Sequence, residues 1–417
     1  MNAAAGKFLE LSAAAVAAIA ARVRAARTEN STPERRAEAL ARAFERWREG
    51  GFPARRAAIA QIARRTGFSP ALLDASIDAL LAPFTRDALL AMAARVAPAG
   101  DTARPNAIGF IVAGNVAGAG LHEIAIALIA GAAAAIKTAS AEPVFFAEFA
   151  RTIAECDPAV GERIAVLNWN RSRTDLTGAL ISSCDAIVAY GGDATIAALA
   201  GAPRLIGFPS RVSAAAVVAD ELDSAALDEI AGSSARDAAL FEQLGCLSPH
   251  QVFVVGGDSG AALDFASRIA AAFDRLTRSM PPPAALALED AAAIRHAREV
   301  ARWRGIGGEP IKLWEGPRLD WTVISDPAAQ FTVSPGFRTV YVSAVRDLSE
   351  LRERLAPVAG RLEAFAIVGN GPECAEIAAI ARALGASHVC AAGAMQSPPL
   401  DWRHGDGAFL DSMGMAL

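Results

Sequence analysis

Residues 107–116 read AIGFIVAGNV, a short apolar run that ends at Gly114-Asn115-Val116. An apolar run of this length is typical of a β-strand that is buried on both faces of a sheet. Further runs of this kind recur along the chain, separated by helix-forming sequence, and we expect strands at 107–113, 134–138, 164–167, 186–190, 204–208 and 214–219. Strands that alternate with helices predict a parallel sheet with helices on both faces.

The same alternation begins again near residue 222. We expect a helix near 263–273 and strands at 251–255, 321–325, 339–345, 365–368 and 388–391. Ser234 is expected to cap a helix that runs to Leu244, because Gly245 is a natural helix stop. The second half of the chain therefore predicts another α/β unit.

The first hundred residues differ from the rest and predict helices alone. Thr32-Pro33 and Ser69-Pro70 each place a capping oxygen before a proline at the first helical position. A chain of 417 residues also suits two domains. We therefore expect an α/β fold with two tandem doubly wound domains and a helical N-terminal region, with boundaries at 1–221, 222–394 and an irregular C-terminal segment at 395–417.

Composition narrows the class of protein. The 40 basic and 45 acidic residues leave a formal net charge of −5, which gives no electrostatic footprint for nucleic acid. The longest apolar run, 124–136, is too short to span a membrane. Five cysteines without paired spacing favour a reducing compartment and indicate neither a zinc site nor a disulfide framework. We expect a cytoplasmic protein without a metal.

Cys246 differs from the other cysteines because it lies in a turn before Leu247-Ser248-Pro249. A cysteine in such a turn is either a nucleophile or a structural residue, and its sequence context leaves both interpretations open. The end of the expected preceding helix disfavours a thiolate, so its activation needs another source. The remaining cysteines lie in apolar contexts that are typical of small buried side chains: Cys156, Cys184, Cys374 and Cys390.

Small and polar residues follow several of the expected strands, where parallel sheets bind ligands. Asn115 is either part of a loop turn or an amide donor for an oxyanion. Gly191-Gly192-Asp193 is either a tight turn or a phosphate-binding turn at a helix N-terminus. Lys137 ends a strand and either reaches solvent or meets a ligand.

Taken in order, these segments resemble the acyl-CoA reductases of bacterial bioluminescence, the fatty acid reductase family within the aldehyde dehydrogenase superfamily. The resemblance runs from about residue 105 to the C-terminus and covers the first hundred residues only loosely. The matching stretches are Gly114-Asn115-Val116-Ala117-Gly118, Lys137-Thr138-Ala139-Ser140, 188–193, Arg211-Val212-Ser213, 237–241, 245–249 and 395–402. An aldehyde dehydrogenase-like fold is the expectation that follows.

For the chemistry, the resemblance implies that Cys246 is the catalytic cysteine and that 222–394 is its domain. Asn115 is similar to the asparagine whose amide joins the cysteine N–H in an oxyanion hole. Hydrolytic members carry a glutamate base in a Glu-Leu-Gly-Gly segment about thirty residues before the cysteine, whereas this chain reads Arg211-Val212-Ser213-Ala214 there. Without a base to activate water, a thioester on the cysteine should persist until it is reduced.

For the cofactor, the resemblance implies that 1–221 holds the NAD(P)-binding domain together with the N-terminal helices. Lys137 is similar to the lysine beside the adenine ribose, and Gly191-Gly192-Asp193 to the turn under the pyrophosphate. Ser140 stands where many members hold the ribose with a glutamate, so NADP(H) is favoured over NAD(H), although Glu142 lies nearby. No Glu-x-Phe-Gly-Pro ribose clamp is present, and Ser334-Pro335-Gly336 is its expected substitute.

The expected reaction is NAD(P)H-dependent reduction of a fatty acyl-CoA to the aldehyde through an acyl-enzyme on Cys246. An acyl phosphate or an acyl-carrier substrate is the nearest alternative. From other classes, a nucleotide-dependent phosphotransferase and a catalytically silent assembly partner stay open. The expected partners are the acyl-CoA substrate, further copies of the chain in a homo-oligomer and, where the pathway needs one, an acyl-transferring or acyl-activating protein. Neither nucleic acid nor a membrane is expected as a partner.

Overall fold

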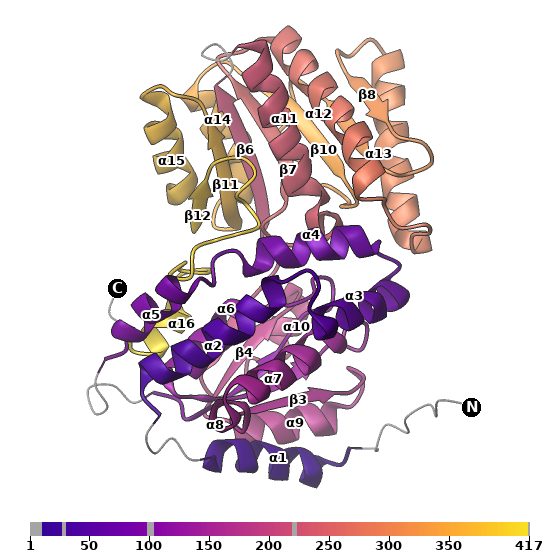
Figure 1. The fold of residues 1–417 in the computed structure, drawn as a ribbon. Coiled ribbons are helices and arrows are strands. Elements are labelled where there is room, and N and C mark those ends of the chain that lie inside the picture. Colours follow the sequence, from indigo (N-terminus) through magenta and orange to yellow (C-terminus); the bar gives the residue numbers. More distant parts are fainter. Residues whose placement is uncertain (1–10, 27–30, 98–103, 219–222, 416–417) are drawn as a thin grey trace.

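The computed structural model describes residues 11–26, 31–97, 104–218 and 223–415. Two sheets of mainly parallel strands, each covered by helices, lie in separate halves of the molecule (Figure 1). The expected arrangement of two tandem doubly wound α/β units is therefore confirmed. No helix among the described residues is both long and apolar enough to cross a membrane.

The first sheet has five parallel strands in the order β3-β2-β1-β4-β5. Its central strand is β1, which pairs with β2 on one side and with β4 on the other. The order reverses between β1 and β4, so a crevice opens there at the carboxyl ends of the strands. The strands span Ala107–Ile111 (β1), Ala133–Thr138 (β2), Ile164–Asn168 (β3), Ala186–Tyr190 (β4) and Leu205–Phe208 (β5).

Helices cover both faces of this sheet because its strands are apolar on both sides. One face packs against α1 (Ala13–Ala25) and α9 (Thr174–Ser183). The rest of the helices of this domain are α2 (Pro33–Arg48), α3 (Pro53–Thr66), α4 (Pro70–Leu81), α5 (Arg86–Ala94), α6 (Leu121–Ala130), α7 (Val144–Cys156), α8 (Pro158–Gly161) and α10 (Asp193–Ala197). Most of them form the core on the opposite face, so the N-terminal helices belong to this domain.

The predicted helix starts in the first hundred residues are confirmed. The Thr32 hydroxyl accepts a hydrogen bond from Arg35 N at 3.3 Å, and the Ser69 hydroxyl accepts one from Leu72 N at 3.2 Å. In both helices, a proline is the first helical residue. Such caps satisfy amide groups that have no partner in the first helical turn.

The second sheet has seven strands in the order β12-β11-β6-β7-β10-β9-β8. All neighbouring strands are parallel except β8 and β9. The strands span Val212–Val218 (β6), Pro249–Val255 (β7), Lys312–Glu315 (β8), Thr322–Ser325 (β9), Thr339–Val345 (β10), Leu362–Val368 (β11) and His388–Cys390 (β12). Because β6 lies in the middle of this sheet, the second domain begins before Val212 and not at the expected residue 222.

Helices again lie on both faces of the second sheet (Figure 1). They are α11 (Ser224–Ala239), α12 (Ser259–Ser279), α13 (Leu288–Ile306), α14 (Leu348–Leu355) and α15 (Glu373–Ala383), with 3₁₀ turns at Leu240–Gln243 and Ala356–Val358. The sequence did not predict β8, α13, α14 or α15. An exposed helix such as α13 and an edge strand such as β8 carry too few buried residues to leave a clear hydrophobic period.

The expected helix from Ser234 to Leu244 is wrong in both of its ends. Helix α11 begins ten residues earlier in the chain, and Phe241, Glu242 and Gln243 have left-handed backbone with φ of 54°, 52° and 61°. Left-handed backbone costs free energy in residues other than glycine, so other contacts must hold it. Here they come from the neighbouring strand: Gln243 Oε1 accepts from Thr339 N at 2.7 Å, and Gln243 Nε2 donates to Thr339 O at 2.8 Å.

The C-terminal segment returns from the second domain to the first (Figure 1). It includes one short helix, α16 (Ala408–Ser412), and is otherwise irregular, as expected. Leu400, Phe409 and Met413 join the core of the first domain, and Met415 forms an isolated antiparallel bridge with Val96. The segment thereby carries its polar residues across the boundary between the two domains.

Candidate active site

One cavity of about 620 Å³ lies where the two domains and the C-terminal segment meet. Asn115, Gly191 and Gly192 line it from the first domain, and Cys246 lines it from the second. His404 lines it from the C-terminal segment. The cavity therefore lies at the crevice where the strand order of the first sheet reverses.

The loop that carries Cys246 is fixed by hydrogen bonds from both sides. The Ser213 hydroxyl, at the start of β6, donates to Cys246 O at 2.6 Å and accepts from Ala364 N at 2.9 Å. Gln396 Nε2 donates to the Ser248 hydroxyl at 3.0 Å. Cys246 itself is half-buried and faces the cavity, so its thiol is held in place and is accessible to a ligand.

The segment before this loop is anchored by a buried ion pair. Arg338 donates to both carboxylate oxygens of Glu242, at 3.0 and 2.6 Å, and to Met280 O at 2.9 Å. Phe337 N also donates to Glu242 O at 2.8 Å. Burial raises the pKa of Glu242, while the guanidinium of Arg338 lowers it. These contacts hold the left-handed residues that lead into the cysteine loop.

Asn115 joins the two domains at the cavity. Its Nδ2 atom donates to Leu244 O at 2.5 Å, in the loop that carries Cys246. The preceding Gly114 lets this loop pack closely on the segment after β2, because a Cβ atom there would lie 2.5 Å from the Cβ of Ala139. The predicted proximity of Asn115 and Cys246 is thus present in the structure.

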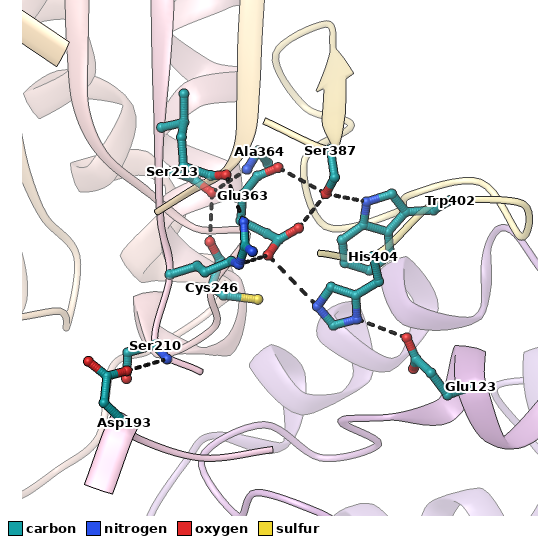
Figure 2. A network of polar contacts seen from close by, with 12 residues as sticks. Glu123, Asp193, Ser210, Ser213, Cys246, Glu363, Ala364, Ser387, Trp402 and His404 are labelled. Atoms are coloured by element: carbon teal, nitrogen blue, oxygen red, sulfur yellow. Dashed lines mark hydrogen bonds and ion pairs between the residues drawn. The ribbon is translucent and has the colours of Figure 1, made fainter. Parts of the chain in front are cut away.

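A charged cluster that the sequence did not predict lies beside the cysteine (Figure 2). His404 Nδ1 is 2.8 Å from Glu123 Oε1, and His404 Nε2 is 3.9 Å from Glu363 Oε2. The imidazole lies between two aromatic rings, with centroid distances of 3.9 Å to Phe208 and 4.1 Å to Trp402. The ring is therefore fixed in position and in orientation.

Burial lowers the pKa of His404, but three neighbours more than compensate. The carboxylate of Glu123, the nearby Cys246 thiol and the charge of Glu363 together raise the pKa of His404 to about 10. Burial raises the pKa of Glu123, yet His404 brings it down to about 2. Both shifts describe the same ion pair, so His404 is an imidazolium and Glu123 a carboxylate near neutral pH.

Glu363 is fully buried and has its own partners. Arg211 Nε lies 3.3 Å from its Oε2, and the Ser387 hydroxyl donates to its Oε1. Trp402 Nε1 donates to the same hydroxyl at 2.8 Å. The segment 211–214 thus brings no carboxylate to the cavity, as expected, but Glu363 and Glu123 bring two from elsewhere.

The expected cofactor residues divide into two groups. Gly191 and Gly192 line the cavity, whereas Lys137, Ser140 and Asp193 do not. Asp193 begins the short helix α10, and its Oδ1 accepts from Ser210 N at 3.3 Å (Figure 2). Lys137 and Ser140 lie at the carboxyl end of β2, and Gly191, Gly192 and Asp193 follow β4, so all of them lie along the same edge of the first sheet.

Lys137 and Ser140 lie at that edge in different environments. Lys137 is buried, burial lowers its pKa, and no carboxylate of the described residues pairs with it. The Ser140 hydroxyl donates to Trp169 O at 3.3 Å. Glu142 is not directed at the crevice, because its Oε1 accepts from Val144 N at 2.8 Å and Phe145 N at 2.9 Å at the start of α7.

Two of the other cysteines have thiols that resist ionisation. Burial raises the pKa of both Cys184 and Cys390 to about 12. Cys156 and Cys374 are half-buried, and neither lines the cavity. Cys246 is the one cysteine of the chain at this site.

The sequence could not indicate the cluster around His404. His404 and Glu123 are 281 residues apart in the chain, and Glu123 lies in an apolar helix where it resembles a packing residue. A lone histidine in an irregular segment carries no spacing signal. Within the described residues, no group of three or more His, Cys, Asp or Glu side chains is arranged to hold a metal ion.

Comparisons with known proteins identify a family whose model matches most of the chain. The family model described as "Acyl-CoA reductase (LuxC)" matches residues 35–414. The long-chain acyl-protein thioester reductase of Aliivibrio fischeri is 23% identical over 266 residues, which cover 61% of this chain and 53% of that protein. The long-chain acyl-protein thioester reductase 2 of Photobacterium leiognathi is 25% identical over 248 residues, covering 58% and 49%. The chain spans about half the length of the curated relatives that it matches.

Solved structures agree with the expected fold. A NAD-dependent benzaldehyde dehydrogenase from Corynebacterium glutamicum has a TM-score of 0.70 at 18% identity and covers 97% of this chain and 89% of its own. Aldehyde dehydrogenase 21 from Physcomitrella patens, solved with the reaction product succinate, has a TM-score of 0.71 at 15% identity with the same coverage. The predicted aldehyde dehydrogenase-like α/β fold is confirmed.

Proposed function

This chain belongs to the acyl-CoA reductase (LuxC) family, and on that premise we propose that it reduces a fatty acyl thioester to the aldehyde through an acyl-enzyme on Cys246. The observation that carries the proposal is the cavity that brings together Cys246, Asn115 and the Gly191-Gly192 turn. A thiol, an amide donor and the crevice of a doubly wound sheet are the parts that a thioester reductase needs.

In the proposed first step, the Cys246 sulfur attacks the thioester carbonyl. The carbonyl oxygen becomes an oxyanion that Asn115 Nδ2 and the Cys246 N–H stabilise by hydrogen bonds. Leu244 O already orients the Asn115 amide, and the second N–H of that amide, which has no acceptor among the described residues, can donate to the oxyanion. One such donor typically contributes roughly 10²–10³ in rate.

The crevice suits a dinucleotide because of its geometry and charge. Gly191 and Gly192 line it, and the buried ammonium of Lys137, which no described carboxylate neutralises, lies near the carboxyl end of the adjacent strand β2. An unpaired buried cation favours an anionic or polyhydroxyl ligand. When bound, a reduced nicotinamide cofactor would supply the hydride that converts the acyl group to the aldehyde.

We propose NADP(H) as the preferred form. Ser140 follows β2 with a hydroxyl and no charge, and Glu142 is engaged as the cap of α7. Neither residue repels a 2′-phosphate. A carboxylate directed at the ribose would have the opposite effect, because like charges at short distance are destabilising.

Hydrolysis of the acyl-enzyme is disfavoured because the two carboxylates that line the cavity are both engaged by other side chains. Glu123 is paired with His404, and Glu363 is held by Arg211 and Ser387. The imidazolium of His404 cannot accept a proton from water. The acyl group on Cys246 therefore waits for the reductant, which favours aldehyde as the product over free acid.

The proposal also concerns which carrier holds the acyl group of the substrate. We favour CoA, and the names of the two bacterial relatives support a second candidate, an acyl group delivered as a thioester on a partner protein. In that case, the chain would need an acyl-transferring partner. Homo-oligomerisation and a cytoplasmic location stay predictions.

The experiment that tests the proposal measures aldehyde formation by the purified protein. Fatty acyl groups are offered on CoA, on a carrier protein and as the acyl phosphate, each with NADPH or NADH. Aldehyde from at least one thioester supports the reductase assignment, and the ranking of carriers identifies the donor. Free acid as the main product, or no turnover of any thioester, would contradict the assignment.

A further inference from the structure

We propose that His404 is a catalytic residue that holds Cys246 as a thiolate and donates a proton to the leaving thiol during acyl transfer, with Glu123 as its positioning residue. The role of His404 as a proton donor in acyl transfer rests on the proposed function. Its role in stabilising the Cys246 thiolate does not, since that role involves only side chains of this chain. The C-terminal segment thereby supplies an active-site residue to the cavity between the domains.

The geometry assigns a role to each nitrogen of the ring. Nδ1 is held by Glu123 at 2.8 Å, so Nε2 is directed to the opposite side, where Glu363 and the Cys246 thiol lie. Figure 2 shows the sulfur of Cys246 directed toward this side of the imidazole. Stacking on Phe208 and Trp402 prevents the ring from turning away.

The charges around the ring favour the imidazolium. Glu123 from α6 and Glu363 from β11 both face it, and Arg211 shares the charge of Glu363. The other titratable neighbours are uncharged: burial raises the pKa of Tyr190 and lowers the pKa of His122 and of His388. The His404 cation is therefore the positive charge that faces the Cys246 thiol.

This cation provides the activation that the sequence could not explain. A thiolate needs a nearby positive charge, and an adjacent imidazolium is the usual source. The preceding helix does not oppose it, because α11 ends at Ala239 and three left-handed residues separate it from the cysteine loop.

The proposed step balances in atoms and charge. The thiolate of Cys246 forms a bond to the carbonyl carbon, and the bond from that carbon to the sulfur of the carrier breaks. The carrier sulfur leaves with the electron pair and takes the proton from His404 Nε2. The products are the acyl-enzyme, the free thiol and a neutral imidazole, which regains a proton from solvent because Glu123 and Glu363 favour its charged form.

The first test measures alkylation of Cys246 by iodoacetamide between pH 5 and 10, resolved by peptide mass spectrometry. The midpoint of this profile, compared between the wild type and variants of the cluster, reports how strongly the cluster stabilises the thiolate. His404→Asn should move the midpoint up and slow alkylation at pH 6.5 at least about tenfold, since one pH unit is a factor of ten. Glu123→Gln keeps an acceptor for Nδ1 but removes its charge, and should shift the midpoint less.

The matched control is His296→Asn, which changes an exposed histidine on α13. Its alkylation profile should equal that of the wild type. Melting temperature and NADPH binding establish that each variant is folded. An unchanged profile in folded His404→Asn would overturn the thiolate pair, whether or not the protein reduces any thioester.

The second test examines the proton donor through the leaving thiol. Acyl-enzyme formation is followed by mass spectrometry without cofactor, using matched acyl groups on an alkyl thiol and on a thiophenol. Because thiophenolate leaves without protonation, His404→Asn should slow transfer from the alkyl thioester at least about tenfold more than from the aryl thioester. An equal loss with both donors would overturn the general-acid role. Normal aldehyde formation by this variant would contradict the inference but leave the proposed function intact.

Discussion

The side chain of Asn115 donates a 2.5 Å hydrogen bond to the main-chain oxygen of Leu244, two residues before Cys246. Asn115 belongs to the first domain and Leu244 to the second, so this contact fixes the amide donor and the nucleophile relative to each other across the domain boundary. The same amide keeps one N–H for the substrate. A change at Asn115 should therefore affect acyl transfer more than folding.

We predict that Asn115→Ala slows formation of the acyl-enzyme by about 10²–10³, because it removes one of two oxyanion donors. Quenched-flow mass spectrometry of the protein mixed with acyl-CoA measures this rate directly. Asn170→Ala, in an exposed loop of the first domain, is the matched control and should react at the wild-type rate. Wild-type acylation in Asn115→Ala would remove this residue from the oxyanion site.

The acyl-enzyme should persist when reduced cofactor is withheld, because neither Glu123 nor Glu363 is free to activate water. Incubation with acyl-CoA alone should add the mass of one acyl group to the Cys246 peptide, and hydroxylamine should remove it. NADPH added afterwards should release the label as aldehyde.

The cysteine itself has a matched control. Cys246→Ala should accept no acyl label and reduce no substrate while it still binds NADPH, whereas Cys374→Ala, a half-buried cysteine outside the cavity, should behave as the wild type. Rapid release of free acid from the wild type without cofactor would show that some group does activate water.

Cofactor preference should depend on residue 140. Wild-type protein is expected to have a lower KM for NADPH than for NADH, and Ser140→Glu should narrow or reverse this ratio by placing a carboxylate beside the ribose site. Initial rates with both cofactors measure it. Ser259→Glu adds the same charge at the exposed first residue of α12 and should leave the ratio unchanged. A tenfold preference of the wild type for NADH would refute this interpretation of Ser140.

Much of the fold was predictable because its central strands are buried on both faces. Strands such as β1 and β4 appear in the sequence as continuous apolar runs, and the structure places them within two residues of the expected bounds. The domain boundary was misplaced because β6 has the same composition as the strands of the first sheet. The strands that pair with β6 are β7 and β11, which come later in the chain. Only this long-range pairing shows that β6 belongs to the second sheet.

The site was predictable only in part, for a similar reason. Cys246 was predicted as a candidate because it lies in a turn. The left-handed backbone of Phe241–Gln243 was not predicted, because it depends on contacts with residues near Thr339 that local propensity does not reveal. His404 reaches the cavity because the C-terminal segment crosses between domains. Contacts of this kind depend on the packed structure and leave no local pattern.

Helix α11 carries a buried acid, Asp237, that contacts the chain where the C-terminal segment begins and should make stability depend on pH. Asp237 Oδ2 accepts from Gly393 N at 2.6 Å, and Gln396 Nε2 donates to Asp237 O at 2.9 Å. Burial raises the pKa of Asp237 from 3.8 to about 7, although the hydrogen bond from Gly393 opposes the shift. The folded protein therefore holds this proton more tightly than the unfolded chain.

The sign of the effect follows from the raised pKa. The stabilising contribution of Asp237 is fully present below about pH 4 and is lost as the pH rises toward 7, because ionisation is then favoured in the unfolded chain.

Asp237→Asn keeps an oxygen for Gly393 N and removes the ionisation. We expect this substitution to raise the melting temperature at pH 8. Its effect on the free energy of unfolding should be more stabilising at pH 8 than at pH 5, by on the order of 1–3 kcal/mol. Thermal unfolding at both pH values measures this, and Asp274→Asn, exposed on α12, should show no such difference. An equal effect of Asp237→Asn at the two pH values would mean that Asp237 stays ionised in the folded protein.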